Sequence, residues 1–122
     1  MQRVERVVRD LLINLTDDDW WGIEAILGPA GDVVGNCGPE FQQLVKDVLE
    51  YVLREGLIEV SHYGSLYQVE NRSPDLLDRI IADLIEHGWM PKGEGFWVAG
   101  TERGKALGTE YLRTEQVSDS DE

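Results

Sequence analysis

The sequence contains no long apolar run. None of its stretches approaches the roughly 20 residues that a helix needs to cross a bilayer, so we expect no membrane insertion. A single cysteine, Cys37, cannot form an intramolecular disulfide. The N-terminal stretch also carries charges where a signal peptide would have an apolar segment. These absences predict a protein of the reducing cytoplasm.

Basic residues are scarce. Eleven lysines and arginines stand against 24 acids, which gives a net charge of −13 and a pI near 4.4. Residues 1–15 hold three arginines and two acids, a local charge of +1, so the remainder carries −14. Such a field repels phosphate backbones and attracts basic proteins. We therefore expect a basic protein partner and no direct contact with nucleic acid.

Motifs of catalytic, metal and nucleotide sites are missing. Cys37 with His62 or His87 is the one cysteine–histidine combination, and no family signature surrounds this cysteine. Their wide separation does not match the close ligand pairs of zinc sites. The run 17–19 lacks the alternating ligands of a calcium loop, and the glycines form no phosphate-binding pattern. We expect no metal, no cofactor and no enzymatic activity.

What the sequence does contain is helical periodicity over most of its length. Apolar residues recur at spacings of three and four, typical of amphipathic helices. Five helices are predicted, at residues 4–15, 17–27, 39–55, 74–87 and 101–113. A chain of 122 residues fits one domain, which we place at residues 1–113. The acidic residues 114–122 are expected to form a disordered tail.

Local signals set the predicted helix ends. Thr16 precedes three aspartates and is expected to cap the helix 17–27, with the acids in its positive first turn. Gly28 and Pro29 should end that helix and begin a glycine-rich loop, 28–38. Pro39 is placed at the first position of the next helix, a common place for proline. Gly56 and Gly88 are expected to end the helices that precede them, and Thr101 to cap the last helix.

Two short β-hairpins are expected between the later helices. Residues 57–60 and 66–69 read as strands joined by a turn at 63–65. Residues 91–95 read as a second turn, and 96–98 as a strand. The predicted fold class is α+β, predominantly helical and winged-helix-like, with about five helices and two short β-hairpins.

The charges disfavour the usual use of a winged helix. Its third helix normally enters the major groove of DNA. Here the helix 39–55 carries four acids against two bases, and the helix 74–87 carries four acids against one base. Neither helix is suited to lie along phosphates, because each phosphate contact relies on a basic side chain.

The adjacent Trp20 and Trp21 are the main candidates for a recognition surface. Neighbouring helical positions lie about 100° apart, so both indoles cannot point into one narrow core stripe. An exposed indole among acids is a good anchor for a basic partner. The alternative is one indole in the core and the other over the loop 28–38. The candidate partner-binding residues are Asp17, Asp18, Asp19, Trp20, Trp21, Glu24, Asp32 and Tyr63, the last at a predicted hairpin tip.

Three segments carry a family resemblance: VLREGLIEV at 52–60, the predicted helix 74–88, and FWVAGTERG at 96–104. Together they resemble small bacterial helix–hairpin proteins, some of which are immunity proteins of polymorphic or contact-dependent toxin systems. The resemblance covers residues 52–107, under half of the chain. Where such proteins often read Leu-Thr-x-x-Gly, this sequence reads GTERG at 100–104, and no binding residue of the family carries over.

The resemblance implies neutralisation of a cognate toxin, often a nuclease, by an acidic protein that covers its substrate site. Electrostatics agrees, since a nuclease needs a basic cleft that an acidic surface can occupy with fast, steered association. The same charge also fits a DNA-mimic inhibitor, such as a phage-encoded antagonist of a nuclease defence system. A third class is a winged-helix adaptor or transcriptional regulator.

Overall fold

The computed structural model describes residues 2–17, 19–62, 69–71, 74–91 and 95–120, with side chains as far as 114. The elements, in chain order, are α1 (Gln2–Asn14), β1 (Trp21–Gly22), α2 (Glu24–Val34), α3 (Pro39–Arg54), β2 (Ile58–His62), α4 (Leu76–Glu86), β3 (Phe96–Gly100) and α5 (Glu102–Ser120). The α+β, mainly helical class predicted from the sequence is confirmed.

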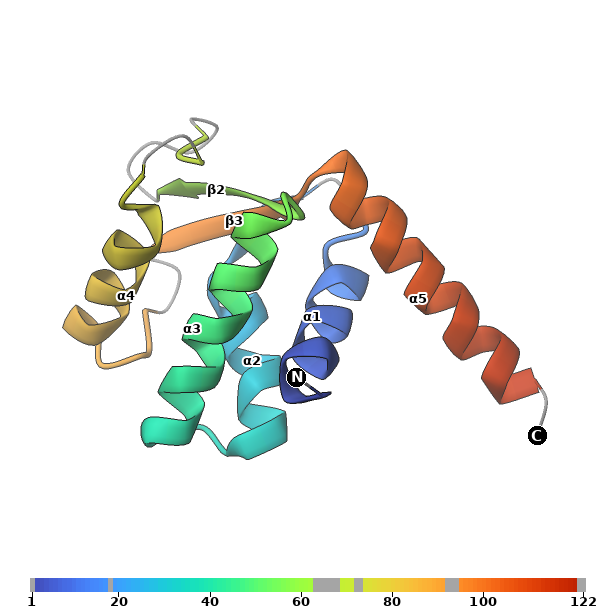
Figure 1. The fold of residues 1–122 in the computed structure, drawn as a ribbon, viewed down its shortest axis with the longest axis horizontal. Helices are drawn as coiled ribbons and strands as arrows, with labels where there is room; N and C mark the ends of the chain where they lie inside the picture. Colours follow the sequence, from blue (N-terminus) through green and yellow to red (C-terminus); the bar gives the residue numbers. More distant parts are fainter. Residues whose placement is uncertain (1, 18, 63–68, 72–73, 92–94, 121–122) are drawn as a thin grey trace.

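Three helices lie beneath a small sheet (Figure 1). α1, α2 and α3 pack against one another, α4 contacts α3, and α5 runs along α1. The apolar stripes of α1 and α3 face the core, as their periodicity predicts, and supply ten of its 24 buried residues. The largest fully buried side chains include Leu11, Leu12, Leu15, Ile23, Ile26, Leu49, Leu57, Ile58, Ile80 and Leu84.

The described strands form one antiparallel sheet of order β1-β3-β2, and not two separate hairpins. Val98 of β3 lies opposite Trp21 on one side and Val60 on the other. Among the described strands the partner of β2 is β3, which follows α4 in the chain. Of the expected return strand of the first hairpin only Val69 is described, and it lies outside any strand. Tyr63 and the predicted turn around it lie outside the described residues.

The edge of β2 that faces away from β3 is hydrogen-bonded by Asn71 and Glu70. Asn71 accepts a hydrogen bond from the Val60 amide at 2.8 Å and donates one to the Ile58 carbonyl at 2.9 Å. The Glu70 amide adds a bond to the Val60 carbonyl at 2.8 Å. The Asn71 amide group therefore does what a peptide group of a neighbouring strand would do at this edge of the sheet.

Both predicted ends of the second helix, residues 17 and 27, are wrong. α2 begins at Glu24 and continues through Pro29 to Val34, so the loop shrinks to residues 35–38. Thr16 does not cap it: the Thr16 hydroxyl donates to the Ile13 carbonyl at 2.9 Å and closes α1. The helix persists past its proline because Ile26 and Ala30 are fully buried in the core, and packing outweighs local preference.

The glycine ends of α3 and α4 are confirmed, and the two helices end in the same way. Gly56 and Gly88 adopt φ values of 66° and 62°, which favour glycine. In each case the following amide bonds to a carbonyl five residues earlier, at 2.9 Å after Gly56 and 2.7 Å after Gly88. This is the Schellman pattern. Pro39 occupies the first position of α3 as predicted. α4 begins at Leu76, two residues after its predicted start, and its Ile85 is 62% exposed.

α5 begins as predicted and ends later. The Thr101 hydroxyl accepts the Gly104 amide at 3.0 Å and donates to the Gly56 carbonyl at 2.7 Å, so it caps the helix. The helix then continues to Ser120, through residues for which a disordered tail was expected. The last turns of α5 extend away from the rest of the chain (Figure 1). The Thr114 hydroxyl donates to the Glu110 carbonyl one turn earlier, at 2.9 Å.

Candidate functional site

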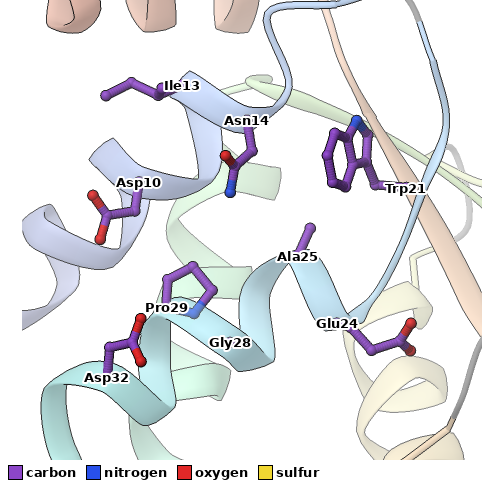
Figure 2. A pocket seen from close by; sticks show the side chains of 9 residues that line it. All are labelled: Asp10, Ile13, Asn14, Trp21, Glu24, Ala25, Gly28, Pro29 and Asp32. Carbon is purple, nitrogen blue, oxygen red and sulfur yellow. The ribbon is translucent and has the colours of Figure 1, made fainter.

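α1 and α2 leave an open groove between them, with Trp21 at one end (Figure 2). We call it the acidic groove. Its volume is about 500 Å³. It is lined by Asp10, Ile13, Asn14, Trp21, Glu24, Ala25, Gly28, Pro29 and Asp32.

Three carboxylates line the acidic groove, and no lysine or arginine is among its described lining residues. Asp10 projects from α1 and Asp32 from α2 at one end, while Glu24 turns away at the other (Figure 2). Within the described part of the chain, neither Asp10 nor Asp32 forms a salt bridge. Acids elsewhere do so, as Glu40 does with Arg3 at 3.1 Å. The groove therefore keeps a negative potential that other parts of the surface partly neutralise.

The Trp21 side chain is fixed in an exposed position. It is 38% exposed, and its indole Nε1 donates a hydrogen bond to Asp17 Oδ1 at 3.1 Å. The same oxygen accepts the Asp19 amide at 3.3 Å, so the acidic turn and the indole form one unit. Pairing of β1 with Val98 of β3 holds the Trp21 backbone. An indole held in this way loses little conformational entropy when a partner covers it.

The two tryptophans do not lie in a helix, because Trp21 begins the strand β1 and Trp20 precedes it. Trp20 is half-buried and lies outside the core cluster. Of the two indoles, that of Trp21 is exposed. The alternative placed one indole in the core and the other over the segment 28–38. Neither is a core residue, but Trp21 does line the groove together with Gly28, Pro29 and Asp32 of that segment, most of which is helix.

The predicted partner-binding residues are only partly brought together. Trp21, Glu24 and Asp32 line the acidic groove, and Asp17 joins them through its bond to the indole. Asp19 is exposed beside Asp17, Trp20 lies outside the lining, and Asp18 and Tyr63 lie outside the described residues.

Sequence reasoning missed Asp10, which it counted within a slightly basic N-terminal segment. One signal could have found it: residues 10–45 contain seven acids and not a single lysine or arginine, which leaves seventeen acids and all eleven bases to the rest of the chain. The acidic surplus is therefore uneven along the sequence. The fold places four of these seven carboxylates in or beside one groove.

Pro29 lies inside α2 and lines the same groove. Because proline has no N–H, α2 lacks the bond from residue 29 to the Ala25 carbonyl. The three carboxylates make the groove suited to ligands rich in hydrogen-bond donors, such as lysine and arginine side chains.

A second cluster of charged residues lies between α4 and the sheet, in a hollow of about 370 Å³. Its one arginine is held by neighbouring groups of the protein. Arg79 lies 3.6 Å from the Glu70 carboxylate and stacks over the Phe96 ring at 5.7 Å, and His62 contacts the edge of the same ring at 5.0 Å. These contacts hold α4 to the sheet, and they leave the Arg79 side chain less available to an incoming ligand.

The described residues contain no group of three or more histidine, cysteine or acidic side chains that could hold a metal ion. Cys37 is exposed in the loop between α2 and α3. In the part of the chain that is described, no helix combines the length and the apolar character needed to span a membrane. In comparisons with known proteins, no protein-family model, no curated protein and no solved structure matches this chain.

Proposed function

We propose that this protein binds a basic protein through the acidic groove and inhibits it by covering its substrate site, as immunity proteins do with toxic nucleases. One observation carries the proposal. The exposed Trp21 indole is held by Asp17 at the end of a groove that three further carboxylates line without a lysine or arginine among them.

The arrangement has the two parts that a protein-binding surface needs. A rigid aromatic side chain supplies apolar contact area, and residues of this type are frequent at the energetic centres of interfaces. The surrounding carboxylates steer a basic partner and select against acidic ones. A nuclease is a fitting partner because its substrate cleft must be basic to hold phosphates.

The scaffold supports fast and tight binding because both walls of the groove are anchored. Leu11 and Leu12 fix α1 in the core, and Ile26 and Ala30 fix α2. The carboxylates therefore stand on helices that need not rearrange when a partner arrives. Preorganisation of this kind lowers the entropy lost on binding.

The test begins with affinity purification from the source organism and identification of a basic chain that co-purifies. Association of that chain with the wild-type protein is then compared with association of the variant Asp10→Asn/Glu24→Gln/Asp32→Asn. At low salt we expect the association rate constant to fall about tenfold or more, because steering by charge contributes factors of roughly 10 to 1,000.

A matched control removes three acids outside the groove. The variant Asp78→Asn/Glu86→Gln/Glu102→Gln has the same net charge, and all three side chains are exposed. We expect its association rate to change much less than that of the groove variant. An equal effect of both variants would mean that only net charge acts, and the proposal would then fail. Inhibition of the captured chain's activity completes the test, since a partner bound without inhibition would contradict the proposed role.

A further inference from the structure

We propose that the basic partner also inserts one large apolar side chain into a notch on the other side of α2 from the acidic groove. The inference rests on the proposed function and names a second element that the partner must carry. The notch, which we call the apolar notch, is lined by Glu24, Leu27, Gly28, Asn36, Phe41, Trp89 and Met90.

Three parts of the chain build the apolar notch. Leu27 comes from α2, Phe41 from the first turn of α3, and Trp89 from the turn after α4. The Phe41 and Trp89 rings meet edge to face, with centroids 6.0 Å apart and planes at 69°. The volume is about 360 Å³, whereas a cavity of roughly 150 Å³ is enough for a benzene ring. The notch therefore has room for a leucine, methionine or phenylalanine side chain.

The Trp89 wall is held in an unfavourable backbone conformation. Trp89 has a φ of 63°, the one positive value among the described residues other than glycine. Its amide donates to the Leu84 carbonyl at 2.7 Å, as the second bond of the Schellman ending of α4. A side chain in this region is strained and persists only where its surroundings fix it, a condition that is frequent at binding sites.

Met90 forms an adjustable rim. It is 67% exposed, the most exposed of the large apolar side chains described. Methionine is flexible and polarizable, so it adapts to the shape of an entering apolar group. An exposed methionine beside an aromatic wall is a costly surface to leave in water, and covering it releases apolar area.

The apolar notch and the acidic groove are parts of one continuous surface. Glu24 and Gly28 line both, so α2 forms the ridge between them. The ridge is low at Gly28, where a Cβ atom would have nothing within 4 Å. A partner segment that crosses α2 at this glycine reaches the Asp10 and Asp32 carboxylates on one side and the Phe41–Trp89 wall on the other.

Charge complementarity decides what occupies the apolar notch. Its one charged lining residue is Glu24, and the adjoining groove is acidic. An apolar side chain flanked by acids would be repelled, whereas one flanked by lysines or arginines would be attracted by both parts of the surface. The occupant is therefore an apolar side chain within a basic segment of the partner protein.

The inference can be tested without the natural partner, with three synthetic peptides of nine residues. The first has two lysines on each side of a central phenylalanine, with glycine spacers. The second replaces the phenylalanine with alanine, and the third replaces the lysines with glutamates. Each peptide is titrated into the full chain, and the indole N–H signals of Trp21 and Trp89 are followed by NMR.

We expect the basic phenylalanine peptide to shift both indole signals, and the basic alanine peptide to shift that of Trp21 alone. The phenylalanine peptide should bind about tenfold more tightly than the alanine peptide, since a phenyl ring is being buried. The acidic peptide should shift neither signal. Met90→Ala should remove most of the tenfold gain, and Ile85→Ala, which truncates an exposed side chain outside the notch, should leave it unchanged.

The outcomes separate this inference from the proposed function. If the basic phenylalanine peptide shifts the Trp21 signal and leaves that of Trp89 unchanged, the apolar notch is not a docking site and the acidic groove remains one. If neither basic peptide shifts the Trp21 signal, the proposed function is overturned as well. An equal Trp89 shift with the acidic peptide, or an unaltered gain in Met90→Ala, also overturns the inference.

Discussion

Replacing Gly104 or Gly108 with alanine should destabilise the protein, although glycine-to-alanine changes normally stabilise a helix. Both glycines lie in α5 where it crosses other backbone. A Cβ at Gly108 would stand 2.8 Å from the carbonyl carbon of Leu12 in α1 and would overlap its oxygen. A Cβ at Gly104 would stand 2.9 Å from the carbonyl carbon of Leu57 and would overlap that oxygen as well.

The size of the effect follows from opposing contributions. Alanine in a helix is favoured over glycine by about 0.5–1 kcal/mol. Overpacking costs about 1–3 kcal/mol, and the upper part of that range applies because the obstacle is backbone that cannot rotate away. We expect Gly108→Ala to lower the free energy of unfolding by about 2 kcal/mol. Gly104→Ala should lose about 1 kcal/mol more, because the displaced Leu57 carbonyl also accepts the Thr101 amide at 3.2 Å.

Urea unfolding followed by tryptophan fluorescence measures this effect. With an m value of about 1.5 kcal/mol per molar urea, a loss of 2 kcal/mol lowers the midpoint by about 1.3 M. Gly28→Ala is the control, because that glycine is also helical and a Cβ there would meet nothing within 4 Å beyond its chain neighbours. Since a residue with a Cβ is disfavoured in a helix directly before Pro29, this variant should lower the midpoint slightly, and by less than either α5 variant. Midpoints at or above wild type for both α5 variants would refute the close packing of α5 on which this reasoning depends.

Three further changes test other contacts. Asn71→Ala should lower the free energy of unfolding by about 1–3 kcal/mol, measured by thermal unfolding, because two hydrogen bonds at the β2 edge are lost. Asn71→Asp should restore little of this stability in the same assay, since a carboxylate cannot donate a hydrogen bond to the Ile58 carbonyl. Thr101→Val should lose about 1–2 kcal/mol through the missing cap of α5, and Thr101→Ser should recover most of it in the same assay. The pKa of Tyr111 lies above its ordinary value of 10.0, because burial and then the neighbouring Tyr51 and Glu5 disfavour the phenolate, with Arg9 opposing them. Folding therefore favours the protonated phenol, and the free energy of unfolding should fall as pH rises above about 10 towards the folded-state pKa. Denaturation at a series of alkaline pH values measures this fall, which should be less steep in Tyr111→Phe.

Features fixed by neighbouring residues could be predicted from the sequence. The glycine ends at 56 and 88, the proline start at 39 and the Thr101 cap each depend on groups within a few residues. Such signals act in the same way in almost any fold, because they satisfy the terminal hydrogen-bonding groups of a helix. The helical class of the protein follows from them together with the apolar periodicity.

Features decided by distant contacts could not be predicted. The pairing of β2 with β3 joins segments that are separated by the whole of α4, and no local turn signal marks it. The close approach of α5 to α1 depends on Gly108. In the sequence by itself, a glycine inside a helix indicates only a locally less stable helix. Such features depend on which surfaces meet, and the amphipathic pattern of each helix specifies only that one face is buried.

The acidic groove exists because α2 does not stop at its proline. Positions 25, 28, 29 and 32 are spaced so that they share one face of a continuous helix, and that face lies opposite positions 10, 13 and 14 of α1. Had α2 ended at residue 27, as the glycine and proline predict locally, Asp32 would stand in a loop with no fixed relation to Asp10. The burial of Ile26 and Ala30 carries the helix past Pro29, so the same core contacts that stabilise α2 also place two carboxylates from distant parts of the sequence along one groove. A base-free stretch from residue 10 to residue 45 is visible in the sequence, but only this continuity turns it into a surface that a basic protein could recognise.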